Sequence, residues 1–141
     1  MTEGATTFRP IRYKQRAKQL ISFEGMELGD RMWPTDFDAV IEWRDRAWIV
    51  FEVKHGDAEM PRGQRLALER FVRDAWRAGK DAVAVVVEHQ VGDPSQDVRL
   101  ADCTVRKVYW SGEFRWRDTK RPMTARELTD GYLRHVGKRS A

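Results

Sequence analysis

The sequence predicts an α/β fold in which a mixed β-sheet is flanked by helices. One observation behind this prediction is the nearly continuous apolar run at 81–88, which is typical of a strand buried on both faces. Another is the helical pattern at 62–78, closely before that run. The third is a pair of short segments, 37–43 and 47–53, which are rich in Val, Ile, Phe and Trp and therefore favour strands.

The N-terminal part of the chain predicts one more helix. Apolar residues at i, i+3 and i+4 spacing indicate a helix from Arg12 to about Glu24. Gly25 and Gly29 then interrupt the pattern. A short extended piece at 26–28 would make two or three strands in all before the second helix.

The C-terminal part predicts a hairpin and a final helix. Segments 104–110 and 114–116 are expected to pair around a turn at Ser111-Gly112. The motif Thr124-Ala-Arg-Glu127 fits a capping box, in which each end residue bonds to the backbone of the other. This motif predicts a helix that begins at Thr124 and runs to about Val136.

Length and composition favour one domain over residues 1–141, with a core at about 12–90 and an extension at about 91–141. No apolar run approaches the roughly 18 residues of a membrane-spanning helix. The N-terminal residues lack the apolar stretch of a secretory signal. A lone cysteine, Cys103, fits a reducing compartment. We therefore expect a cytoplasmic protein without a membrane partner.

Charge is distributed unevenly along the chain, although the formal net charge is only +4. Residues 1–20 carry a net charge of +4, residues 21–98 a net of −6, and residues 99–141 a net of +6. An acidic middle between basic flanks is what a protein needs if it binds both a divalent metal and a polyanion. A solvated surface of mixed charge would show the same distribution.

The residues that could carry chemistry cluster in the predicted hairpin at 37–53. A turn at 44–46 would place Asp38 opposite Glu52, and Asp36 opposite Lys54. Directly opposite Cβ atoms lie about 4.5–5.5 Å apart, so two carboxylates could share one cation. Without such a cation the two charges would repel, and one carboxylate would take up a proton.

The ligand types indicate which metal would bind. Hard oxygen ligands without cysteine favour Mg²⁺ or Mn²⁺ over zinc. Lys54 would then orient or deprotonate a water, or stabilise charge on a phosphate. Gln64 lies on the predicted core-facing side of the second helix. Glu24 ends the apolar face of the first helix, and a metal site would give this polar side chain a partner.

Asp38, then Glu52-Val53-Lys54 on the next strand, then Gln64 in the following helix, resemble the PD-(D/E)XK nuclease superfamily. The resemblance covers about residues 12–90. It implies a restriction-endonuclease-like mixed sheet of core order αβββαβ, to which the C-terminal hairpin and helix are appended.

The resemblance also implies roles for single residues. Asp38 and Glu52 would be metal ligands, Lys54 the catalytic lysine and Gln64 the glutamine that many members carry in that helix. Glu24 would be a first-helix acid found in some members. Asp36 follows Pro-Thr and competes with Asp38. We favour Asp38, because the apolar run begins directly after it and it pairs with Glu52.

The expected function is Mg²⁺- or Mn²⁺-dependent hydrolysis of phosphodiester bonds in DNA, with branched DNA as one candidate substrate. No nucleotide cofactor is expected. A homodimer is expected, because duplex DNA presents two strands to be cut. The residues expected to contact DNA phosphates are all basic: Arg12, Lys14, Arg62, Arg106, Arg115 and Arg117.

Two alternatives remain open from the sequence. One is a catalytically silent protein that binds nucleic acid or another partner through the same fold. The other is an ordinary α/β domain whose acidic hairpin pairs only with its own arginines.

Overall fold

The computed structural model describes residues 22–29 and 34–139, and the chain divides into two units, residues 1–34 and 35–141. The described residues of the first unit form turns and irregular structure. The helix predicted from Arg12 lies mostly outside the described residues, and its expected end at 22–24 is not helical. The extended piece predicted at 26–28 is not a strand. Gly25 and Gly29 have φ angles of 84° and 59°, a left-handed conformation that interrupts helix and strand alike.

The second unit contains a five-stranded mixed sheet with the order β1-β2-β3-β4-β5. Strands β2 and β3 are parallel, and the other neighbouring pairs are antiparallel. The elements, in chain order, are β1 (Ala39–Trp43), β2 (Ala47–His55), α2 (Arg62–Arg77), β3 (Asp81–His89), a 3-10 turn η2 (Leu100–Asp102), β4 (Thr104–Trp110), β5 (Trp116–Arg117) and α3 (Ala125–Arg139).

The prediction of a mixed sheet flanked by helices is confirmed. Helix α2 crosses from β2 to the parallel strand β3, as a parallel connection requires. The first helix and the first strand of the αβββαβ order are not among the described elements. No helix in the described ranges is both long and apolar enough to span a membrane.

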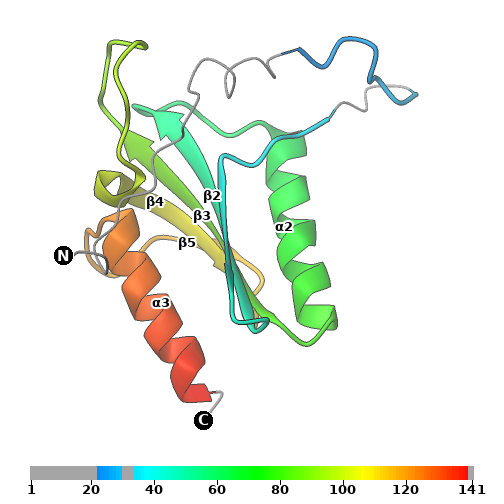
Figure 1. The fold of residues 1–141 in the computed structure, drawn as a ribbon, viewed down its shortest axis with the longest axis vertical. Coiled ribbons are helices and arrows are strands. Elements are labelled where there is room, and N and C mark those ends of the chain that lie inside the picture. Colours follow the sequence, from blue (N-terminus) through cyan, green and yellow to red (C-terminus); the bar gives the residue numbers. More distant parts are fainter. Residues whose placement is uncertain (1–21, 30–33, 140–141) are drawn as a thin grey trace, which may run out of the picture. The chain divides into compact units, whose positions relative to one another are not determined.

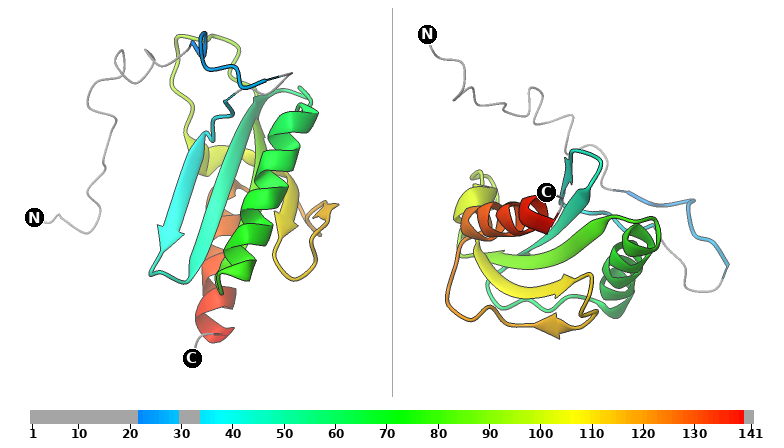
Figure 2. Two further views of the ribbon diagram at one scale, coloured as in Figure 1. Left: turned by 90° about the vertical axis from the view of Figure 1, so that its right-hand side faces the viewer. Right: turned by 90° about the horizontal axis from the view of Figure 1, so that it is seen from below.

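The sheet lies between α2 and α3, which cover opposite faces (Figures 1 and 2). Alternate residues of β2 point to the two sides, so Val50 packs with Leu68 of α2. Phe51 belongs to the other core, against which Leu128 of α3 packs. Strand β3 is buried on both faces, with six consecutive buried residues at 82–87, as its apolar run predicts.

The β1–β2 turn has the register that the sequence predicts. Trp43 pairs with Ala47, and the ladder continues to Ala39 opposite Phe51. Arg44 and Asp45 both have positive φ angles, of 51° and 59°. Two left-handed residues in succession match the twist of a tight hairpin. This register carries Asp38, one residue before β1, to the position beside Glu52.

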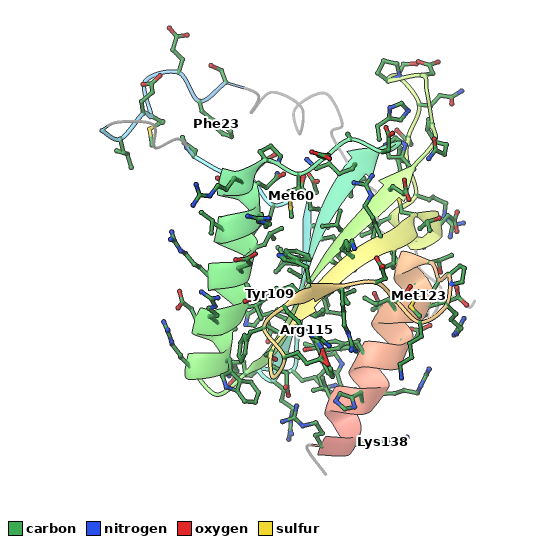
Figure 3. The ribbon with its side chains drawn as sticks, turned by 180° about the vertical axis from the view of Figure 1, so that it is seen from behind. Phe23, Met60, Tyr109, Arg115, Met123 and Lys138 are labelled. Atoms are coloured by element: carbon green, nitrogen blue, oxygen red, sulfur yellow. The ribbon has the colours of Figure 1, made fainter. Side chains whose placement is uncertain are left out.

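The predicted strand at 114–116 is wrong in its bounds, because β5 contains only Trp116 and Arg117. Tyr109 pairs with Trp116, so a longer connection than Ser111-Gly112 joins the strands. Phe114 has a φ of 57° and leaves the extended conformation. Its ring nevertheless packs with Trp116 against the α2-side core, where Tyr109 lies between α2 and the sheet (Figure 3).

The capping box before α3 forms as the sequence predicts, and it makes a stability prediction. Glu127 N–H donates to Thr124 Oγ1 at 3.2 Å, and Thr124 N–H donates to Glu127 Oε1 at 3.0 Å. We expect Thr124→Ala to lower the free energy of unfolding by about 1 kcal/mol, because an N–H at the start of α3 loses its acceptor. Urea denaturation measures this change. Thr124→Ser keeps the hydroxyl and should stay close to wild type; equal losses in both variants would contradict the cap's role.

Candidate active site

Asp38 and Glu52 meet at the end of β2. Val53 N–H donates to Asp38 Oδ2 at 2.7 Å, which fixes the Asp38 carboxylate beside the neighbouring residue of β2. Phe37 anchors the same segment, because its ring packs edge-on against Phe71 of α2 with centroids 5.6 Å apart. The Asp38 carboxylate is therefore held by a hydrogen bond from the backbone of Val53, and its segment is held by the packing of Phe37 on Phe71.

Glu52 is buried on the α2 side of the sheet. Its exposed fraction is 3 %, and it follows Phe51 in a strand that is otherwise apolar there. Lys54 Nζ lies 3.5 Å from Glu52 Oε1. The other oxygen, Oε2, has no hydrogen-bond partner among the described residues. A buried polar atom without a partner is costly, and an ionised one more so.

Lys54 is held in place by the first turn of α2. Its Nζ donates to Gln64 Oε1 at 3.0 Å. Helix α2 begins directly after Pro61, and Met60 lies at this end of the helix (Figure 3). Gln64 thus points toward the sheet, as the sequence predicts, and joins α2 to the end of β2.

The environment raises the pKa of Glu52 to about 7. Burial is the largest cause, because it penalises the charged form. The charge of nearby Asp38 raises the pKa further, whereas Lys54 opposes the shift. The carboxylate pair therefore holds a proton near neutral pH unless a cation replaces that proton.

The competing aspartate, Asp36, is exposed and precedes β1, and the same is true of Asp38. Asp38 is distinguished by its contacts, because it accepts a hydrogen bond from Val53 N–H and its charge raises the pKa of Glu52. Glu24 is exposed and belongs to the unit of residues 1–34. Its described surroundings do not support the predicted role as a metal ligand.

Most arginines predicted to contact phosphate already have partners. Arg106 donates from Nη1 to Ala58 O at 2.6 Å, donates from Nη2 to Gly56 O, and lies 3.5 Å from Glu88. It therefore clamps the connection between β2 and α2. The sequence contains no sign of this role, because the acceptors are backbone carbonyls 48 and 50 residues earlier.

The remaining predicted phosphate contacts differ in their surroundings. Arg117 of β5 lies 3.0 Å from Glu113. Arg115 lies 3.9 Å from the same residue and belongs to the β4–β5 connection (Figure 3). Arg62 is exposed at the first residue of α2, close in sequence to Gln64. Arg12 and Lys14 lie outside the described residues.

The carboxylate pair suits a cation such as Mg²⁺, which needs few protein ligands, better than a metal ion held entirely by protein side chains. Within residues 22–29 and 34–139, no group of three or more His, Cys, Asp or Glu side chains could hold a metal ion. Mg²⁺ commonly keeps several waters and takes one or two carboxylates together with substrate phosphate. Asp38 and Glu52 supply two such carboxylates, and a cation would satisfy the unpartnered Glu52 Oε2.

No family model matches the chain, and no curated protein or solved structure matches it either.

The pKa of Glu52 makes a stability prediction for the metal-free protein. A glutamate with a pKa of about 7 when folded and about 4.5 when unfolded loses stabilisation as pH rises through 7. In EDTA at pH 8, we expect Glu52→Gln to raise the free energy of unfolding by about 1–3 kcal/mol, and by much less at pH 5.

Denaturant unfolding at both pH values measures this difference. Glu59→Gln removes a carboxylate from the exposed loop after β2 and serves as the control, with little change expected at either pH. Identical pH dependence in wild type and Glu52→Gln would show that burial of Glu52 does not shift its titration.

Proposed function

We propose that this protein is a divalent-metal-dependent deoxyribonuclease that hydrolyses phosphodiester bonds in DNA. The observation that carries the proposal is the buried carboxylate of Glu52, which has an unpartnered oxygen and lies beside Asp38. A purely structural acidic residue would be exposed or paired with an arginine. Instead Glu52 pairs, among the described residues, with Lys54, which also donates a hydrogen bond to Gln64.

The chain's own residues have distinct tasks in this proposal. Asp38 and Glu52 would hold the cation, which supplies Lewis-acid stabilisation of charge on the phosphate oxygens. Lys54 places a positive charge where charge grows on the attacked phosphate, or orients the attacking water. Gln64 accepts a hydrogen bond from Lys54 and so limits the positions of its ammonium group.

The site lies at the edge of the sheet where the carboxyl ends of parallel strands β2 and β3 meet. Ligands of open α/β sheets commonly bind at such an edge. The basic C-terminal segment, with a net charge of +6 over residues 99–141, supports a polyanionic substrate.

Branched DNA and a homodimer remain part of the proposal. Val40 of the edge strand and Trp76, 45 % and 41 % exposed, offer apolar surface for a second copy.

Substitution of the site residues tests the chemistry. Glu52→Gln and Lys54→Ala should each lower Mg²⁺- or Mn²⁺-dependent cleavage of labelled DNA by about 100-fold or more, because one removes a ligand and the other a charge at the phosphate. Duplex, branched and single-stranded substrates should be compared, with EDTA abolishing all cleavage. Glu59→Gln and Lys138→Ala provide exposed controls, and full activity in either site variant would refute the assignment.

The two candidate aspartates form a matched pair for a second test. Asp38→Asn should lose activity to a similar extent as Glu52→Gln, because it removes the charge beside Glu52. Asp36→Asn changes an exposed carboxylate two residues away and should retain most activity. Folding of both variants should be checked by circular dichroism. A reversed result would make Asp36 the metal ligand.

Electrostatic binding predicts a steep salt dependence. DNA affinity should fall by orders of magnitude between about 50 and 200 mM salt, because phosphate contacts release counterions. Arg62→Ala should reduce the slope of log affinity against log salt by about 1. Arg126 is paired with Asp130 on α3, so Arg126→Ala is the matched control. Fluorescence anisotropy in EDTA measures both slopes, and a flat dependence would contradict phosphate binding.

A further inference from the structure

A cavity lies on the opposite side of the sheet from Glu52. It has a volume of about 580 Å³ and opens between α3, β4 and the segment at 117–123. Val83, Val108 and Leu128 form part of its wall, and they belong to the α3-side core. This volume lies in the range of small-molecule sites. The cavity shares none of its lining with the carboxylate pair.

The lining includes one aromatic side chain whose polar atom has no partner. Trp110 Nε1 is buried and makes no hydrogen bond among the described residues. The Tyr132 hydroxyl interacts instead with Ser111, Asp81 and Arg139, none of which lines the cavity. An indole N–H donates, and a buried donor needs an acceptor. A ligand that enters the cavity with ring or carbonyl acceptors would supply one.

The rim of the cavity is basic. Four basic side chains line it against two acidic ones, which gives a net charge of +2. The two acidic groups are already paired, Asp118 with Lys107 at 2.8 Å and Glu127 with Arg121 at 3.8 Å. Of the four cations, Arg121 is thus paired, and Arg117 lies 3.0 Å from Glu113. No ion pair within the described part of the chain involves Lys120 or Arg134.

The Trp110 ring adds a preference for flat ligands. The Arg117 guanidinium lies over it, 5.6 Å from its centroid, and His135 meets it edge-on at 5.7 Å. The cavity thus combines an apolar and aromatic wall, a buried donor, and exposed cations. These features together suit a planar heteroaromatic ring that carries an anionic group.

We propose that this cavity binds a mononucleotide, with the base against the apolar wall and the phosphate at Lys120 and Arg134. The base supplies an acceptor for the Trp110 donor, and the phosphate supplies negative charge to the basic rim. The nucleotide is a bound ligand here and takes no part in the chemistry at Glu52. A free nucleotide and the terminal nucleotide of a strand present the same base and phosphate, and the titration distinguishes them.

Calorimetric titration of the full chain in EDTA tests the proposal. The probes are adenosine 5′-monophosphate, thymidine 5′-monophosphate, adenosine, inorganic phosphate and a 5′-phosphorylated single-stranded tetranucleotide. We expect the monophosphates to bind, and adenosine to bind about tenfold or more weakly, because it lacks the charged group. Binding of the tetranucleotide but not of the free nucleotides would assign the site to strand ends. The reverse would assign it to free nucleotides.

Variants locate the binding. The double variant Lys120→Ala/Arg134→Ala should weaken monophosphate binding about tenfold or more. Arg126→Ala/Lys138→Ala removes the same charge from α3 outside the cavity and should change little; Lys138 lies at the far end of α3 (Figure 3). The indole N–H resonance of Trp110, assigned with Trp110→Phe, should shift on titration.

Three results would overturn the proposal. One is the absence of binding by every nucleotide probe at millimolar concentration. Another is equal affinity for adenosine and its monophosphate. The third is binding that both double variants retain while the Trp110 resonance stays unmoved.

Discussion

Burial of the Glu52 carboxylate is the constraint on which the rest of the site depends. Its strand neighbours form the core, so the carboxylate at this position is 3 % exposed and lies beside a second one. Its one ion pair among the described residues, with Lys54, involves Oε1 and leaves Oε2 without a partner. Asp38 is held by the backbone of Val53, and Lys54 is shared with Gln64. The remaining oxygen calls for a proton or a metal ion, because no donor among the described residues reaches it.

The β2–α2–β3 unit explains how this arrangement is built. Parallel strands bring their carboxyl ends to one edge, and α2 must begin near that edge to run back along the sheet. Gln64 therefore reaches Lys54 from the first turn of the helix. Arg106 reinforces the connection from β4, by bonding to the carbonyls of Gly56 and Ala58. The same sheet separates this edge from the cavity beneath α3, so the two proposed ligands would not compete.

Local patterns made much of this arrangement predictable. The left-handed turn at Arg44-Asp45 fixes the register that joins Asp38 to Glu52, and apolar runs and a capping box mark β3 and α3. Features set by distant contacts were not predictable. The conformation of Phe114 shortens β5, and Arg106 binds carbonyls that carry no sequence signature. The unpartnered Trp110 N–H depends on the packing of α3 against β4, which no local pattern reveals.

The central claim is that Asp38 and Glu52 together bind a divalent cation. Anomalous scattering from crystals grown with saturating Mn²⁺ at pH 8 tests it most directly. At that pH, above the pKa of about 7, the Glu52 carboxylate is free to bind metal. We predict an anomalous peak between the two carboxylates that is absent from Glu52→Gln crystals. Wild-type crystals without such a peak, with Glu52 still buried, would contradict the account.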